Sequence, residues 1–321
     1  MDEFARIAAL FRPLTRGAPG ALDLLDDAAM LPSTGGEALV TTNDALVEGV
    51  HFLPNTPPED IAAKALGANL SDLAAMGAYP VGYLLALALT PAHDEAWLAR
   101  FTQGLAAGQA AFDLPLLGGD SVSTPGPLTL SITAFGRCPP GQMLRRSGAS
   151  VGDVVWVSGT LGDGALGLLA DRGTLNPDLS DWAPYLRDRY RRPRPRVALG
   201  QALRGVASAA MDVSDGIGGD ADKLCRASGV GMVIDCTAIP LSDAARAVLA
   251  VRPDLQTLAW SGGDDYELLF TAPVSAGAAL EQIASTLNLP LTPIGRVQAG
   301  DRTVFHGIDG VLLALTGWTH T

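Results

Sequence analysis

The feature of this sequence that most constrains the fold is a short apolar run between two helical stretches. Residues 81–89 are almost entirely apolar but too few to cross a bilayer, and they predict a fully buried strand. The Ala- and Leu-rich segment 59–76, which follows two prolines and ends at Gly77, predicts a helix before this strand. Segment 94–112 predicts a helix after it. Helices that alternate with buried strands are typical of an α/β fold.

The rest of the chain continues this alternation. Strands are predicted at 38–42, 115–117, 128–135, 154–158, 208–211, 231–235 and 266–271, with short strands over 293–315, and helices at 4–14, 164–171, 196–205, 220–227, 242–249 and 276–287. A chain of 321 residues usually forms more than one core. The Pro- and Gly-rich stretch 137–153 interrupts the pattern, so we predict two domains, 1–148 and 149–321. The Arg- and Pro-rich stretch 185–196 is expected to be a surface arm.

The charge balance limits the partners. The chain has 34 acidic and 22 basic residues, a formal net charge of −12, and only two lysines, Lys64 and Lys223. Such a chain repels nucleic acid and anionic membranes, so we expect neither as a partner. Surplus carboxylates could hold divalent cations if the substrates were phosphates, although acidity often only aids solubility.

The cysteines and the N-terminus bear on the compartment. The three cysteines form no CxxC and no zinc spacing, and an odd, sparse count is typical of a reducing compartment. The first residues are acidic and include no long apolar run, so no signal peptide is predicted. We therefore expect a cytoplasmic protein.

Six short acidic motifs carry the candidate chemistry. Most follow a predicted strand or lie beside Gly, Ser or Thr, where a carboxylate can point into a crevice and a backbone N–H can bind oxygen. Each motif alone is more often an ordinary turn or N-cap, but hard oxygen ligands of this kind suit Mg²⁺ bound to phosphates. Asp72, in an apolar helical run, and the turn predicted at 118–120 stand out. The motifs are Asp26-Asp27, Thr42-Asn43-Asp44, Ser71-Asp72, Gly118-Gly119-Asp120-Ser121, Asp212-Val213-Ser214-Asp215-Gly216 and Gly262-Gly263-Asp264-Asp265.

Other phosphate-binding and catalytic motifs are absent from the sequence. It has no GxxxxGK[ST] loop, and GTLGDG at 159–164 lacks the dinucleotide-binding spacing. No HExxH motif, zinc cluster, Ser nucleophile elbow or Cys/His pairing indicates zinc or covalent catalysis. The four histidines are dispersed, and a lone histidine is more often structural.

Taken in order, these motifs resemble those of the thiamine-monophosphate kinases, a family of the aminoimidazole-ribotide-synthetase-like superfamily. The matching stretches are LLDDAAML, TTNDALVEGVHF, KALGANLSDLAAMGAYP, LLGGDS, LRRSGASVGD, MDVSDGIGGD, SGGDDYELLF and the terminal GW, from residue 22 to residue 318. The resemblance implies an α/β protein of two domains. The N-terminal mixed sheet would form a barrel with that of a second subunit, with helices outside, in a homodimer, and the C-terminal domain would be an α/β sandwich.

The resemblance also implies an activity and its site residues. The family transfers the γ-phosphate of ATP directly to thiamine monophosphate with several Mg²⁺ ions. Because the acceptor is already an anionic phosphate oxygen, little general-base catalysis is required, and we expect no catalytic side chain beyond the ligands. The Mg²⁺ ligands would be Asp27, Thr42, Asn43, Asp44, Asp72, Asp120, Asp212 and Asp215. The ATP contacts would be Gly118, Gly119, Asp120, Arg146 and Ser214, and the substrate contacts His51, Asp264 and Trp318.

Some positions depart from the family pattern or admit a plainer role. Leu25 stands where a glycine usually precedes the paired acids, Asn43 where threonine is usual and Asp264 where glutamate is usual. Arg146 could be a solvated linker residue, and Trp318 could be a tail aromatic that closes the core.

Other functions remain open on the sequence alone. Selenophosphate synthetases need a Cys or selenocysteine and a Lys near the N-terminus, and the first 60 residues contain neither. The hydrogenase-maturation relatives end in a reactive Cys, whereas this chain ends in GWTHT. An ATP-dependent ligase or cyclase like aminoimidazole-ribotide synthetase is a closer alternative, although it lacks the combination of SGGxDYEL and a terminal Trp. A divalent-cation-binding regulatory protein without turnover is the alternative from another class.

Overall fold

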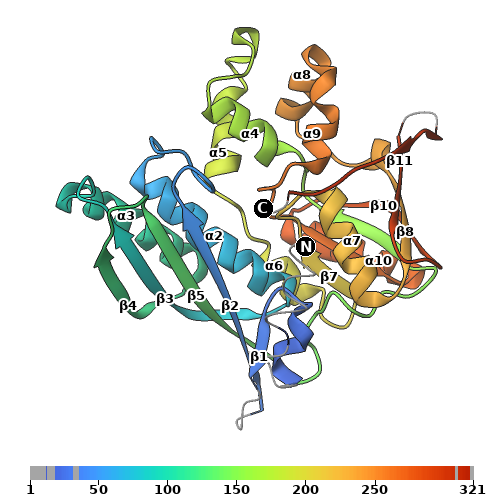
Figure 1. Ribbon diagram of the computed structural model, residues 1–321. Coiled ribbons are helices and arrows are strands. Elements are labelled where there is room, and N and C mark those ends of the chain that lie inside the picture. Colours follow the sequence, from blue (N-terminus) through green and yellow to red (C-terminus); the bar gives the residue numbers. More distant parts are fainter. Residues whose placement is uncertain (1–11, 13–18, 32–35, 308–309, 319–321) are drawn as a thin grey trace.

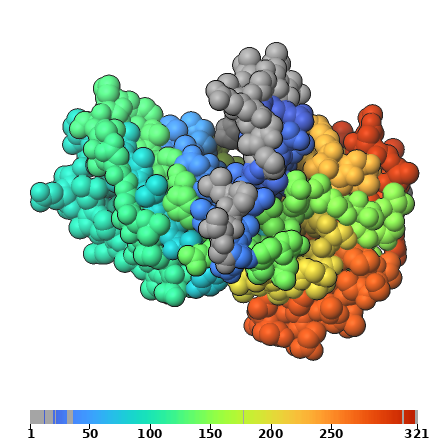
Figure 2. Space-filling model, turned by 90° about the horizontal axis from the view of Figure 1, so that it is seen from below, coloured from blue at the N-terminus to red at the C-terminus, as the bar shows by residue number. Residues whose placement is uncertain are grey.

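The computed structural model describes residue 12 and residues 19–31, 36–307 and 310–318. It contains two sheets, one from each half of the chain, with helices packed on them (Figure 1). Figure 2 shows the two halves as adjoining lobes, with blue residues of the N-terminal segment where they meet. These features confirm the predicted α/β class with two domains.

The N-terminal half forms a five-stranded mixed sheet. Its order is β1-β2-β5-β3-β4, in which β3 and β4 run parallel and the other neighbours run antiparallel. The elements are η3 (Pro19–Leu24), β1 (Ala29–Leu31), β2 (Ala38–Val47), α2 (Pro58–Ala75), β3 (Tyr79–Leu89), α3 (Glu95–Phe112), β4 (Leu116–Ser123) and β5 (Thr129–Cys138).

Helix α2 is the centre of the molecule. It packs on β2, β3 and β5 of the N-terminal sheet, on α3, and on α6 and β7 of the other half. Leu70 and Leu73 of α2 are fully buried in a core that they share with Tyr83 and Ile132. Because α2 is surrounded by both halves, polar residues on it can reach a junction between the domains while remaining buried.

Among the residues that the structure describes, no element covers the face of the N-terminal sheet opposite α2. Buried residues alternate along β5 with partly exposed ones, and all eight residues of β4 are exposed. Leu84, Leu117 and Val122 are exposed apolar side chains of β3 and β4. The predicted barrel with a second subunit would cover this face and stays a prediction.

The C-terminal half forms a seven-stranded sheet. Its order is β12-β11-β8-β10-β6-β9-β7, in which β11 and β8 run parallel and the other neighbours run antiparallel. Helices α4, α5, α8 and α9 share a small core of their own and stand above this sheet in Figure 1. The elements are β6 (Val154–Ser158), α4 (Asp163–Asp171), η4 (Pro177–Leu179), α5 (Ala183–Arg191), α6 (Val197–Ala202), β7 (Ala209–Asp212), α7 (Ile217–Ser228), β8 (Gly231–Asp235), η5 (Cys236–Ala238), α8 (Asp243–Val251), η6 (Pro253–Leu255), α9 (Gln256–Ser261), β9 (Leu268–Ala272), η7 (Val274–Ala276), α10 (Gly277–Leu287), β10 (Leu291–Gln298), β11 (Thr303–His306) and β12 (Leu312–Leu313).

The prediction of a surface arm at 185–196 is wrong. Most of this stretch belongs to α5, which buries Leu186, Arg189 and Tyr190. The arginines that suggested exposure are paired with acids instead: Arg189 Nη2 lies 3.2 Å from Glu267 Oε1, which is itself buried. Buried arginine is tolerated when a carboxylate neutralises it.

The prediction of a turn at 118–120 is also wrong. These residues lie within β4, beside β3. A Cβ at Gly119 would lie 1.8 Å from the Leu85 carbonyl oxygen, so glycine here permits the close pairing of the two strands. The helix predicted at 4–14 lies outside the described residues apart from residue 12. Within the described ranges, no helix has the length and apolar character that a membrane span requires.

Candidate active site

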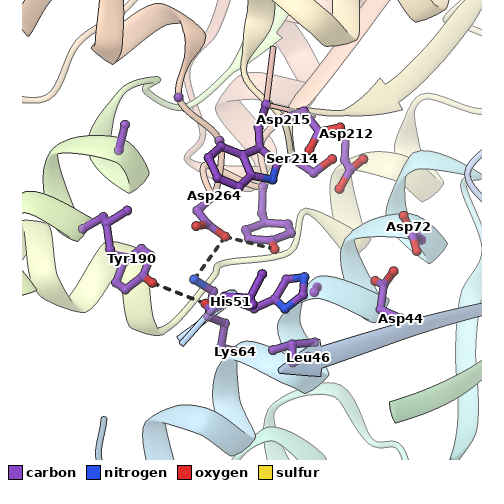
Figure 3. A pocket seen from close by; sticks show the side chains of 18 of the residues that line it. Asp44, Leu46, His51, Lys64, Asp72, Tyr190, Asp212, Ser214, Asp215 and Asp264 are labelled. Carbon is purple, nitrogen blue, oxygen red and sulfur yellow. Dashed lines mark hydrogen bonds and ion pairs between the residues drawn. The ribbon is translucent and has the colours of Figure 1, made fainter. Parts of the chain in front are cut away.

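A cavity of about 790 Å³ lies between the two halves of the chain. It is lined by α2 and β2 from the N-terminal half, and by α4, α5 and the loops around Asp215 and Gly263 from the C-terminal half (Figure 3). All the predicted site residues line it except Gly118, Gly119 and Asp120. The scattered motifs therefore converge on one place.

Three carboxylates meet at one end of the cavity. Asp27 follows η3, Asp72 lies in α2 and Asp212 ends β7, and one oxygen of each lies within 4.8 Å of the others. Thr42 Oγ1 donates to Asp72 Oδ2 at 2.5 Å, and Ser71 Oγ donates to Asp212 Oδ2 at 2.7 Å. We call Asp27, Asp72 and Asp212 the carboxylate cluster. Hydrogen bonds from neighbouring motifs hold its members side by side.

The carboxylate cluster concentrates negative charge in a buried place. Burial, together with repulsion by Asp44, Asp212 and Asp27, raises the pKa of Asp72 well above its usual range. Burial and repulsion by Asp27 likewise raise the pKa of Asp212. Like charges held this close are costly unless a cation neutralises them. Carboxyl groups with raised pKa values in a cavity are typical of functional sites.

Two arginines hold the paired acids at 26–27. Arg145 Nη2 lies 3.0 Å from Asp26 Oδ2. Arg146 binds both oxygens of Asp27, through Nε at 2.9 Å and Nη2 at 2.5 Å. Burial opposes the charge of Arg146, but the Asp27 carboxylate raises the pKa of this guanidinium above its usual value. Arg146 is therefore not a solvated linker residue but lies beside the carboxylate cluster.

A lysine lies on the Asp215 side of the cavity. Lys223 of α7 places Nζ 2.5 Å from Asp215 Oδ2 and 2.8 Å from Asp220 Oδ1. A Cβ at Gly263 would lie 2.0 Å from the Ser214 carbonyl oxygen. The loops that carry Ser214 and Gly263 therefore pack directly on each other, which is why two motifs far apart in sequence share one wall.

The motif on β2 splits between the two faces of its sheet. Thr42 and Asp44 are two residues apart, so their side chains share the face toward α2. Asn43 points the other way, because its Nδ2 donates to Ser131 Oγ at 2.9 Å and Thr133 Oγ1 at 2.8 Å on β5. The amide nitrogen of Asn43 is thus committed to the sheet.

The opposite end of the cavity is aromatic and basic (Figure 3). Lys64 Nζ lies 3.1 Å from Asp264 Oδ1 and 3.6 Å from the centroid of the Tyr190 ring. Tyr266 OH donates to the same Asp264 oxygen at 3.2 Å, and Tyr190 OH donates to the His51 carbonyl oxygen at 3.3 Å. Asp264 and His51, both predicted substrate contacts, therefore lie in one network away from the carboxylate cluster.

Trp318 does not close a core. Trp318 is 60% exposed, and its backbone N–H donates to the Asp215 carbonyl oxygen at 2.9 Å. A Cβ at Gly317 would lie 2.7 Å from Gly219 Cα, so glycine lets this segment pack on α7. Trp318 is thereby held at the cavity that it lines, and it remains largely exposed.

Several cavity residues are missing from the sequence-based site. Lys64 and Tyr266 lie in stretches that carry the family resemblance, so a signal for them was present. Tyr190 falls in the stretch that was expected to be a surface arm, and Lys223 belongs to no singled-out acidic motif. For these two, only the packing of α5 and α7 against the other elements reveals the contact.

Asp120 lies away from the cavity of its own chain. It belongs to β4, the exposed edge strand of the N-terminal sheet, and its Oδ1 accepts the backbone N–H of Ser121 at 2.8 Å. Figure 1 places β4 at the far edge of the sheet from the C-terminal half. Gly118 and Gly119 lie in the same strand.

The residues present fit Mg²⁺. Carboxylate oxygens are the hard ligands that this ion prefers, and those of the carboxylate cluster are close enough to share one. Burial first, and then repulsion by neighbouring carboxylates, raises the pKa of Asp72 and Asp212, so a bound cation would stabilise their charged forms.

Comparisons with known proteins agree along the chain. The family models "AIR synthase related protein, N-terminal domain" and "AIR synthase related protein, C-terminal domain" match residues 25–138 and 150–308. A thiamine-monophosphate kinase of Caulobacter vibrioides is 45% identical over 324 residues, which cover 99% of this chain and 90% of that relative.

Solved structures give the same result. The crystal structure of thiamine-monophosphate kinase from Stenotrophomonas maltophilia K279a is 43% identical, with a TM-score of 0.80, over 95% of this chain and 98% of that one. A structure named AaThiL complexed with AMPPCP and TMP is 30% identical, with a TM-score of 0.85, over 100% of this chain and 97% of that one. This chain therefore belongs to the AIR synthase related family and, within it, to the enzymes of the thiamine-monophosphate kinase family.

Proposed function

We propose that the protein transfers the γ-phosphate of ATP directly to the phosphate of thiamine monophosphate and so forms thiamine diphosphate. The main support for this proposal is that the two ends of the cavity differ in chemistry. One end has the carboxylate cluster, and the other has Asp264 with aromatic side chains. ATP and thiamine monophosphate each combine anionic phosphate with a flat ring. Both fit such a cavity with their phosphates toward the end that can hold cations. The relative solved with AMPPCP and TMP supports the same pair of ligands.

The acidic residues would hold the metal. Bound Mg²⁺ ions neutralise phosphate groups that repel each other and so allow them to align. The chain's own part is to keep the carboxylates close and fixed, which Thr42 and Ser71 do by hydrogen bonds to Asp72 and Asp212. The proposed ligands are Asp27, Thr42, Asn43 through its backbone carbonyl, Asp44, Asp72, Asp212 and Asp215, joined by Asp120 of a second copy.

Arg146 is the proposed clamp for ATP phosphates. A guanidinium presents planar donors that match two oxygens of a phosphate, as they match the two oxygens of Asp27 in this structure. Ser214 lines the cavity beside Asp215 and would contact the same nucleotide. The Gly118-Gly119 backbone would contact ATP only in an assembly that brings β4 to a cavity.

Trp318, Asp264 and His51 would bind thiamine monophosphate. The exposed indole of Trp318 offers a face for the cationic thiazolium ring, and a cation over indole is a favourable pairing. The acceptor is an anionic phosphate oxygen, so no side chain has to remove a proton from it. Orientation and charge neutralisation carry the proposed mechanism.

We also propose that the protein acts as a homodimer. The open face and edge of the N-terminal sheet expose Leu84, Leu116, Leu117 and Val122, and an exposed apolar patch is typical of an interface. Pairing two such sheets in a barrel would also cover the free edge of β4. Asp120 lies on this strand, so a second copy would bring it to a carboxylate cluster that it does not reach within its own chain. A cytoplasmic location belongs to the same proposal and rests on the three free, buried cysteines.

Release of ADP tests the proposed activity. We expect ADP from ATP and Mg²⁺ only when thiamine monophosphate is present. Release of ADP only with formylglycinamidine ribotide would favour the ligase or cyclase alternative. No release with any substrate would favour a regulatory protein that binds cations without turnover.

A further inference from the structure

We infer that Lys64 is a positioning residue for the thiamine end of the site, where it holds the Asp264 carboxylate and the Tyr190 ring in the places from which they meet the substrate. This inference rests on the proposed function and adds a residue outside the acidic motifs. Lys64 lies on α2, in the N-terminal half, whereas Asp264 and Tyr190 belong to the C-terminal half. The contact therefore joins the two walls of the cavity.

Lys64 is expected to act on the substrate through other side chains rather than by direct contact. Lys64 is only 2% exposed. Its Nζ lies 3.1 Å from Asp264 Oδ1 and 3.6 Å from the centroid of the Tyr190 ring. Lys64 lines the cavity, but its Nζ is buried against Asp264 and Tyr190. Any effect of Lys64 on substrate binding must pass through these two side chains.

Asp264 is held from both its backbone and its side chain. Its φ is +71°, a left-handed conformation that non-glycine residues seldom adopt, and its N–H donates to the Ser214 carbonyl oxygen at 2.9 Å. Lys64 and Tyr266 both bind Oδ1. Within the described part of the chain, Oδ2 receives no such donor and is left for a substrate N–H or cation. A residue fixed in this way is typical of a prepared binding group.

The charge of Lys64 also separates the two ends of the cavity. It neutralises Asp264, a carboxylate that would otherwise extend the negative charge of the acidic motifs to the thiamine end. With Lys64 in place, excess negative charge is confined to the region of the carboxylate cluster. This arrangement directs the phosphates and their cations to the carboxylate cluster and leaves the aromatic end for a ring.

The chain offers a matched control on the same helix. Asp60 lies four residues before Lys64 and also joins α2 to α5, through Arg191 Nη1 at 3.2 Å and Arg192 Nε at 2.6 Å. Asp60 does not line the cavity. A rise in KM for thiamine monophosphate that came only from loosening of α5 should therefore be as large in Asp60→Asn as in a Lys64 variant. A rise that comes from loss of substrate positioning should be seen only in the Lys64 variants.

The experiment is steady-state kinetics of the full-length protein with ATP, Mg²⁺ and thiamine monophosphate. The variants are Lys64→Met, Asp264→Asn, the double variant and Asp60→Asn. Lys64→Met should raise KM for thiamine monophosphate about tenfold, the size expected for loss of a charged contact, with KM for ATP and kcat nearly unchanged. The rise in KM of the double variant should be well below the product of the two single rises, because much of the effect of Lys64 passes through Asp264. Asp60→Asn should leave KM for thiamine monophosphate unchanged.

Several outcomes would overturn the inference. The first is an unchanged KM for thiamine monophosphate in Lys64→Met, and the second is an equal rise in Lys64→Met and Asp60→Asn. The third is a KM in the double variant that equals the full product of the two single effects. If Lys64→Met fails to fold, Lys64→Gln keeps an N–H donor toward Asp264 and should show a smaller rise in the same KM. A wild-type protein that forms no ADP with thiamine monophosphate would refute the proposed function itself, whereas wild-type turnover with an unchanged KM in the Lys64 variants would refute only the role of Lys64.

Discussion

Replacing Asp72 by asparagine should stabilise the metal-free protein while it removes activity. Asp72→Asn keeps an acceptor for Thr42 Oγ1 but deletes one charge of the carboxylate cluster, whose oxygens lie within 4.8 Å of one another. Two unit charges at that distance repel by about 3.5 kcal/mol at an effective dielectric constant of about 20. Proton uptake relieves part of this repulsion, because burial and neighbouring carboxylates raise the pKa of Asp72. We therefore expect a net gain of about 1–2 kcal/mol.

Thermal unfolding with and without Mg²⁺ measures this effect. For domains of this size a gain of that order raises Tm by about 2–8 °C. Millimolar Mg²⁺ should raise the Tm of the wild-type protein, because a ligand that binds only the folded state stabilises it, and should have little effect on Asp72→Asn. Turnover should fall about 100-fold to 1000-fold, the usual cost of removing one electrostatic group that acts in the transition state.

Asp60→Asn is the control for this prediction. Asp60 is also an aspartate on α2 and is 5% exposed, but Arg191 and Arg192 neutralise it. Asp60→Asn should lower Tm because these ion pairs are lost, but the rise in Tm with Mg²⁺ should remain. If Asp72→Asn instead lowers the Tm of the metal-free protein as Asp60→Asn does, Asp72 is a satisfied core acid and the electrostatic reasoning fails. Near-normal Mg²⁺-dependent turnover in Asp72→Asn would remove it from the metal site.

Further predictions concern the tail, the dimer and the pH dependence of stability. Trp318→Ala should raise KM for thiamine monophosphate about tenfold with little change in kcat, and an unchanged KM would place Trp318 outside the site. Asp72→Asn and Asp120→Asn proteins should each be inactive. Subunits of the two mixed at random should recover about a quarter of wild-type activity, because about half of the dimers are mixed and one of the two sites in each is intact. No recovery would show that Asp120 does not serve a partner's cavity. Burial and neighbouring carboxylates raise the pKa of Asp72 and Asp212, so the folded metal-free protein binds protons more tightly than the unfolded chain. Its Tm should therefore rise as pH falls from neutral toward their ordinary pKa of 3.8, and Mg²⁺ should remove this rise; a metal-free Tm that falls over the same range would contradict it.

Much of the fold was predictable because its signals are local. The buried strand at 81–89 and the helices around it appear as β3, α2 and α3 with small shifts at their ends. The two failures have tertiary causes. Arg189 in the expected surface arm is buried because Glu267 neutralises it, and Gly118 and Gly119 are extended because β3 lies against them. Neither partner can be identified from the neighbouring sequence.

The candidate site was predictable as a set of motifs but not as an arrangement. Motif order pointed to Asp27, Asp72 and Asp212, and the structure brings them together. Lys64 lies in a stretch that carries the family resemblance, but its role, like that of Tyr190, depends on contacts between α2, α5 and the loop at 264. Spacing along the chain does not show which residues of two domains face each other across a cavity.

Transfer of labelled phosphate would follow the proposed reaction itself. The protein would be incubated with Mg²⁺, thiamine monophosphate and ATP labelled in its γ-phosphate, and the products separated by chromatography. We expect the label to appear in thiamine diphosphate in amounts equal to the ADP formed. ADP without labelled thiamine diphosphate, or label released only as inorganic phosphate, would contradict it.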